Sequence, residues 1–140
     1  MATHRRAGGA GHGAQRSARP WRVLSALFLL AMGAIHLYLV FQWASGLIGV
    51  LFVLNAIGGF VLALAILVAP RRFLPVASVL GLLLMVGTLL GLVLALTVGI
   101  FGVREQIGSE LVVPTLVDES LGAVVLAVTT AVAVRARDLA

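Results

Sequence analysis

The stretch GLIGVLFVLNAIGGFVLALAILVAPRR, residues 46–72, decides the fold. From Gly46 to Ala69 it contains no charged residue, and Asn55 is its only strongly polar side chain. A lipid hydrocarbon core of about 30 Å is crossed by roughly 20 helical residues. The run meets that length, and Pro70-Arg71-Arg72 ends it. The stretch therefore predicts a transmembrane helix.

The composition of the whole chain agrees with this interpretation. Of its 140 residues, 61% are hydrophobic and 11% are charged, and the mean hydropathy is +1.16. Soluble domains are about half apolar and a quarter charged. A chain this short cannot hide so much apolar surface in its own interior, because small domains bury a modest fraction of their surface. The composition predicts an integral membrane protein.

Three further apolar runs are long enough to cross a membrane. We expect an all-α, four-helix transmembrane bundle over residues 21–137, with helices at about 22–43, 46–69, 73–101 and 114–134. The first run exceeds the apolar core of about 7–15 residues in a signal peptide, which favours a retained helix over cleavage. Residues 1–20 are rich in Gly, Ala and Arg without apolar periodicity, and we expect a disordered basic arm there.

Charge predicts the orientation of the bundle. All ten basic residues are arginines, and the formal net charge is +5. With a cytoplasmic N-terminus, only Arg104 lies outside, in a loop that also carries Glu105 and Glu110. Arginine accumulates on the cytoplasmic side, so we expect both termini in the cytoplasm. The arginines flank membrane segments, which favours the lipid bilayer and not nucleic acid as their partner. The absence of lysine, with abundant Ala, Gly, Leu and Val, suggests a GC-rich bacterial genome and hence a bacterial plasma membrane.

Small residues recur at four-residue spacing on two of the predicted helices. In lipid, helices associate where small side chains let the backbones approach closely. The spacing predicts helix-packing faces on the second and third helices at Gly59, Ala63, Gly87, Gly91, Ala95 and Gly99.

One layer of the predicted bundle collects polar side chains. His36 precedes Trp43 by seven residues, which places it roughly 10 Å below the outer interface. An ionisable side chain facing lipid costs about 2.5–3.5 kcal/mol, so His36 should face the bundle and find a partner. The candidate intramembrane polar site comprises His36, Asn55, Thr97, Asp118 and Glu119.

Two interpretations of this layer stay open. In the first, Glu119 accepts a hydrogen bond from His36 and the layer is a proton, metal or ligand site; adjacent Asp118 and Glu119 lie about 100° apart, so only one should point inward. In the second, the carboxylates are solvated near a helix end, and His36 makes a structural bond to a carbonyl or hydroxyl group.

The sequence lacks the residues that most catalytic and cofactor sites need. There is no cysteine, and a single histidine lies inside the predicted membrane segments. Bis-histidine haem needs two histidines, and zinc takes three or four ligands. No phosphate loop, nucleophile elbow or metalloprotease signature is present. We therefore expect no enzyme, no cofactor and no metal.

Three short motifs together resemble those of an uncharacterised family of small four-helix integral membrane proteins of actinobacteria. They are GAIHL at 33–37, LFVLNAIGGF at 51–60 and LTVGIFGVRE at 96–105. The resemblance covers roughly residues 22–135 and implies a site at His36 and an inward carboxylate at Glu119. It also implies Leu-Pro in the turn after the third helix, where this chain has Ile100-Phe101. It implies no activity.

Three functions are compatible with the sequence. The first is a non-enzymatic accessory or structural subunit of a larger membrane complex, favoured by the missing catalytic motifs and the packing faces. The second is a small transporter or proton or ion pathway that uses His36, Asn55 and Glu119, as a homo-oligomer. The third is a redox module associated with a metal or haem.

Overall fold

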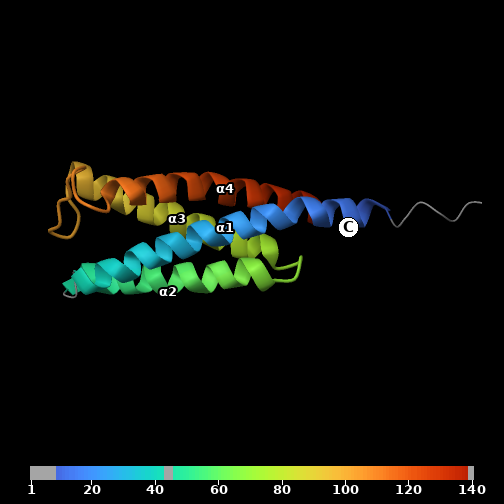
Figure 1. Ribbon diagram of the computed structural model, residues 1–140, viewed down its shortest axis with the longest axis horizontal. Coiled ribbons are helices and arrows are strands. Elements are labelled where there is room, and N and C mark those ends of the chain that lie inside the picture. The colour runs from blue at the N-terminus through green and yellow to red at the C-terminus, as the bar shows by residue number, and fades with distance from the viewer. Residues whose placement is uncertain (1–8, 43–45, 139–140) are drawn as a thin grey trace, which may run out of the picture.

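The computed structural model describes residues 9–42 and 46–138 and contains four helices. These are α1 (Gly9–Gln42), α2 (Gly46–Val68), α3 (Leu74–Thr97) and α4 (Val112–Asp138), shown in Figure 1. Each contains a segment of 23 to 26 residues that is apolar enough to cross a membrane. The described residues form no strand beyond one isolated bridge. The predicted all-α four-helix architecture is confirmed.

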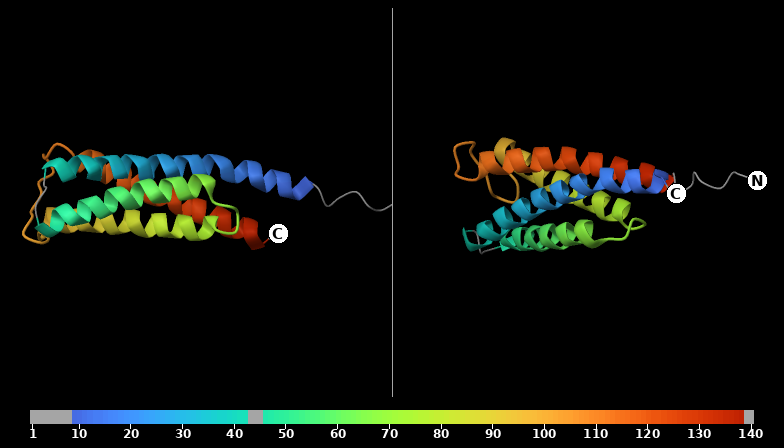
Figure 2. Two further views of the ribbon diagram at one scale, coloured as in Figure 1. Left: turned by 90° about the horizontal axis from the view of Figure 1, so that it is seen from below. Right: turned by 45° about the vertical axis from the view of Figure 1, so that its right-hand side comes forward.

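The helices run alternately up and down. α1 packs mainly on α2, α3 packs on α4, and α1 also packs on α4, whereas α1 and α3 scarcely touch. Figure 2 shows the start of α1 and the end of α4 on the same side as the α2–α3 connection, and we call this side the basic end. The opposite end carries the end of α1, the start of α2 and the segment 98–111, and we call it the loop end.

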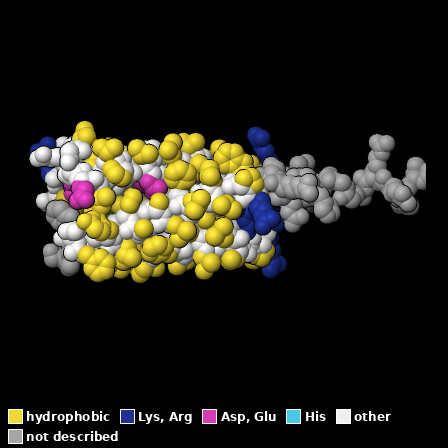
Figure 3. Space-filling view, in the orientation of Figure 1, with side chains coloured by type: hydrophobic (Ala, Val, Ile, Leu, Met, Phe, Trp, Pro, Cys, Tyr) yellow, Lys and Arg dark blue, Asp and Glu magenta, His cyan; other side chains and the backbone are white. Residues whose placement is uncertain are grey.

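Charged side chains are divided between these two ends. Most of the arginines visible in Figure 3 gather at the basic end, and the carboxylates lie towards the other. The basic end carries Arg19, Arg22, Arg71, Arg72, Arg135 and Arg137, and the segment 98–111 carries Arg104, Glu105 and Glu110. The bundle therefore separates the charges along its axis as the sequence predicted.

The first helix starts earlier than predicted. α1 begins at Gly9, so residues 9–20 of the expected disordered arm are helical. Extending an existing helix avoids the unfavourable nucleation step, and Ala10, Ala14 and Gln15 are good helix formers. Residues 1–8 of the predicted arm, and residue 43 at the predicted end of the first helix, lie outside the described residues.

The third helix ends earlier than predicted, at Thr97 and not Phe101. The backbone turns there through positive φ angles of 84° at Gly99, 49° at Phe101 and 79° at Gly102. Glycine adopts such angles without steric cost. Ile100 and Val103 exchange two backbone hydrogen bonds of 2.9 Å across the turn. These glycines end the helix although the apolar run continues.

α1 and α2 make a close backbone contact. A Cβ atom on Gly59 would lie 2.8 Å from the Leu29 carbonyl oxygen and 3.0 Å from the Gly33 Cα atom. Ala63, one turn further along α2, is fully buried. Gly59 and Ala63 therefore occupy the packing face that their spacing predicted, with Gly33 as the partner on α1.

Polar groups in the basic half of the bundle are satisfied by hydrogen bonds. The Arg22 guanidinium donates to the carbonyls of Ile66, Leu67 and Ala69 at 2.8, 3.0 and 2.7 Å, which caps the C-terminus of α2. The hydroxyls of Ser25 and Thr129 lie 2.7 Å apart and join α1 to α4. These bonds fasten three helices together at this end.

Candidate functional site

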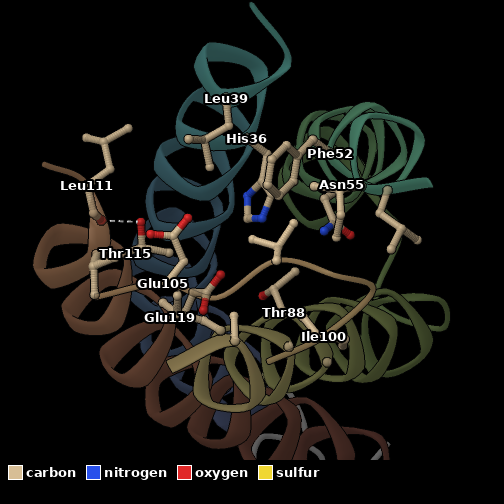
Figure 4. Close-up of a pocket in the computed structure, with 18 of the residues that line it drawn as sticks. His36, Leu39, Phe52, Asn55, Thr88, Ile100, Glu105, Leu111, Thr115 and Glu119 are labelled. Carbon is tan, nitrogen blue, oxygen red and sulfur yellow. Dashed lines mark hydrogen bonds between the residues drawn. The ribbon is translucent and has the colours of Figure 1, made fainter. Parts of the chain in front are cut away.

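A cavity of about 570 Å³ lies between the helices in the loop half of the bundle. All four helices and the segment 98–111 line it, as the close-up in Figure 4 shows. Its polar lining includes His36, Asn55, Thr88, Thr115 and Glu119. The structure thus brings three of the five predicted site residues, His36, Asn55 and Glu119, to one space.

Glycines on α3 leave this space empty. Gly87 and Gly91 line the cavity, and a Cβ atom on either would meet nothing within 4 Å. Their predicted role in helix packing is therefore wrong, because no backbone approaches them. The predicted packing role of Gly99 on the third helix is also wrong, because Gly99 lies in the turn after α3. Ala95 is buried beside the cavity, where its carbonyl accepts a 3.0 Å bond from the Glu105 amide.

His36 is buried on α1, with 5% of its surface exposed. Its Nδ1 atom lies 2.9 Å from the Met32 carbonyl oxygen, and its ring packs edge-on against Phe52 at 5.6 Å between centroids. A carbonyl oxygen can only accept, so Nδ1 carries the proton and Nε2 of the neutral ring is an acceptor. The backbone bond within α1 therefore selects the tautomer.

Glu119 is fully buried on α4, and neither of its carboxylate oxygens has a hydrogen-bond partner. The predicted hydrogen bond between His36 and Glu119 is therefore absent, because the His36 donor is occupied by Met32. The two side chains face each other across the cavity (Figure 4). Thr88 lies beside Glu119 but donates its hydroxyl hydrogen to the Met85 carbonyl at 2.9 Å.

Asp118 and Thr97 do not line the cavity. Asp118 is buried with 9% exposure, and its Oδ2 atom has no partner. Only Glu119 of the adjacent carboxylates points into the cavity, as their angular separation predicted, but burial of both contradicts the solvated alternative. Thr97 is exposed at the end of α3 and donates to the Val93 carbonyl at 2.7 Å. It does not belong to the site.

The loop segment forms the cavity lining at the loop end. The segment 98–111 contributes Ile100, Phe101, Val103, Glu105, Ser109, Glu110 and Leu111 to the lining. Glu105 and Glu110 add two more carboxylates at this end. The sequence did not predict that the segment 98–111 lines the cavity. The position of this segment depends on the tight turn at residues 99–102.

A packed layer closes the cavity towards the basic end. A Cβ atom on Gly81 of α3 would lie 3.1 Å from Leu126, 3.2 Å from Leu29 and 3.5 Å from Ile66. These three side chains come from the other three helices and are fully buried. Met85, one turn further along α3 towards the loop end, is buried against Gly122. The four helices therefore meet in this layer.

The cavity lining combines polar and apolar side chains. No group of three or more His, Cys, Asp and Glu side chains suited to a metal occurs among residues 9–42 and 46–138 that the structure describes. Comparison of the chain with protein-family models, with curated proteins and with solved structures finds no match.

The sequence analysis did not predict Thr88 as a site residue. Thr88 lies seven residues before Ala95 and so shares its helix face.

Proposed function

We propose that this protein is a multi-pass bacterial plasma-membrane protein that takes up a small molecule from the extracytoplasmic side. It binds or transports this molecule and does not catalyse a reaction on it. Both termini lie in the cytoplasm, and the loop end faces outward. One observation carries the proposal: a fully buried carboxylate, Glu119, has both oxygens unpaired and lines a cavity of about 570 Å³.

The contrast between the two halves of the bundle supports a ligand. In the basic half, Ser25, Ser78 and Thr129 are buried and all are hydrogen-bonded. In the loop half, Glu119 is buried without a partner. Buried polar groups in native proteins nearly always have a partner, and an unpaired one within a membrane is expensive and marks function. A bound molecule supplies what the helices do not.

The packed layer at Gly81 supports binding from one side of the bundle. A ligand entering from the loop end meets Leu29, Ile66 and Leu126 below the cavity. The described arrangement therefore binds from one side, and transport requires a second arrangement in which this layer separates. The accessory-subunit role is the function that stands if the cavity is not reached from outside.

Cysteine accessibility tests this proposal directly, because the chain has no native cysteine. Gly91→Cys places a thiol in the cavity, where there is room for it. The adjacent Leu90→Cys is the matched control, since Leu90 is 57% exposed on the outer surface of the bundle and does not line the cavity. We expect a membrane-impermeant thiol reagent, added outside intact cells, to modify the first variant and spare the second.

Two further variants test the orientation in the same assay. Gly108→Cys in the loop should react from outside, and Arg72→Cys at the basic end should react only after the membrane is permeabilised. Equal protection of the thiols at positions 90 and 91 would refute an open cavity. Labelling at 72 and protection at 108 would reverse the orientation.

A further inference from the structure

We propose that the ligand of this cavity is a small amphipathic organic cation, an ammonium group on an apolar body, with Glu119 as its counter-ion. The inference rests on the proposed binding function and specifies its ligand. It starts from a fully buried, unpartnered carboxylate that points into the cavity from α4.

The polar lining of the cavity is rich in acceptors. Glu119 of α4 lines it, and Glu105 and Glu110 line it at the loop end. His36 adds an acceptor, because its Nδ1 proton is held by the Met32 carbonyl and Nε2 is left with a lone pair. Asn55 makes no hydrogen bond to another described side chain, so its amide offers an acceptor oxygen as well as N–H donors. A ligand that donates hydrogen bonds matches this lining.

The charge of the lining favours a cation. Among the described residues that form the cavity wall, none is an arginine or a lysine. Arg104, the basic residue of the loop, lies outside that wall and donates to the Thr97 carbonyl at 2.9 Å. Three carboxylates line the cavity and no described arginine does, so the charge of its lining attracts cations and repels anions. Negative charge inside the bundle is then compensated by the ligand.

The remaining wall fits an apolar body. The apolar lining includes leucine side chains of α1, α2 and α3, together with Phe52 of α2 and Phe101 of the loop. Aromatic faces attract organic ammonium groups, and a volume of about 570 Å³ falls within the usual range for small-molecule sites. A bare metal ion is a poorer match, because the described residues provide no cluster of three ligands for one.

Three probes with one carbon skeleton test the inference. They are 3-phenylpropylammonium, the neutral 3-phenylpropanol and the anion 3-phenylpropanoate, measured by equilibrium dialysis at neutral pH against the full chain in lipid nanodiscs. Gly91→Phe fills the cavity, so the difference between wild type and this variant is cavity binding and excludes partition into lipid. Leu90→Phe, which places the same aromatic side chain outside the cavity, is its control.

We expect cavity binding of the ammonium probe, and weaker or no binding of the other two. Glu119→Gln keeps the size of the side chain and removes its charge. This variant should lower affinity for the ammonium probe by at least about tenfold and leave the affinity for the alcohol unchanged. Retained binding of the alcohol, or a cooperative thermal transition, shows that the variant is folded.

The outcomes separate this inference from the proposed function. If the alcohol or the anion binds as well as the ammonium, and Gly91→Phe blocks it, the binding function stands and the cation inference is overturned. The cation inference is likewise overturned if Glu119→Gln binds the ammonium normally. If no probe shows cavity binding, the inference fails, and the cysteine at position 91 decides separately whether the cavity is open.

Discussion

The contact between α1 and α2 predicts opposite effects for the same substitution at different glycines. In Gly59→Ala, the new methyl group lies 2.8 Å from the Leu29 carbonyl oxygen and 3.0 Å from the Gly33 Cα atom. Both obstacles are backbone atoms, so relief requires the two helices to separate. Such overpacking costs about 1–3 kcal/mol, from which about 0.5–1 kcal/mol is regained by replacing a helical glycine. We expect a net loss of roughly 1–2 kcal/mol.

Two other glycines, one on α2 and one on α3, provide matched controls. In Gly58→Ala, the methyl group lies 3.1 Å from Leu84 Cδ2, which is the flexible tip of a side chain, so the loss should be small. In Gly87→Ala, the methyl group enters the open cavity, and only the helical gain of about 0.5–1 kcal/mol applies.

Stability can be measured by titration with a denaturing detergent in mixed micelles, following tryptophan fluorescence. Gly87→Ala should have the highest midpoint concentration of denaturing detergent. Wild type and Gly58→Ala should have similar, lower midpoints, and Gly59→Ala should have the lowest. A Gly59→Ala variant as stable as Gly87→Ala would refute the close crossing of α1 and α2.

Three more predictions concern polar groups and use the same titration. Arg22→Gln should cost about 1.5–3 kcal/mol, because three carbonyls at the end of α2 lose a charged donor, whereas Arg19→Gln at an exposed position should change little. Ser25→Ala and Thr129→Val should show a coupling of roughly 0.6–1.7 kcal/mol in a double-mutant cycle, because their hydroxyls bond each other. Glu119→Gln should stabilise the empty protein, because a neutral amide costs less to bury without a partner than a carboxylate does.

Each of these predictions has a result that contradicts it. Equal midpoints for the variants at 22 and 19 would show that the cap on α2 contributes nothing. Additive effects at 25 and 129 would mean that the hydroxyls act separately. A less stable Glu119→Gln variant would show that the carboxylate already has a partner within the bundle.

The sequence predicts the helices well because lipid leaves few alternatives. A backbone within the hydrocarbon core must satisfy its own hydrogen bonds, so a run such as 46–69 becomes a helix and the charges of residues 70–72 mark its end. The ends inside apolar sequence are harder. α3 stops at Thr97 because of the backbone angles at Gly99 and Gly102, and hydropathy does not register these angles.

The rotation of each helix about its axis limits the prediction of the site. Depth along the axis follows from residue counting, so His36, Asn55 and Glu119 were placed in one layer correctly. When a helix is apolar on all sides, its sequence does not show which side faces the interior of the bundle. Gly59 and Gly91 are both small residues at regular spacing, yet Gly59 admits a neighbouring backbone and Gly91 leaves a void. A missing Cβ atom permits both outcomes, and only the packing of all four helices selects one.

The packed layer around Gly81 closes the cavity towards the basic end, and this has a consequence for the proposed ligand binding. In the proposed function, such a cavity exchanges ligand with the solution at the loop end. Its occupancy then follows the ligand concentration at that end and is independent of the concentration at the basic end. The proposed binding protein would respond to one side of the membrane, and only separation of Leu29, Ile66 and Leu126 would connect the two sides.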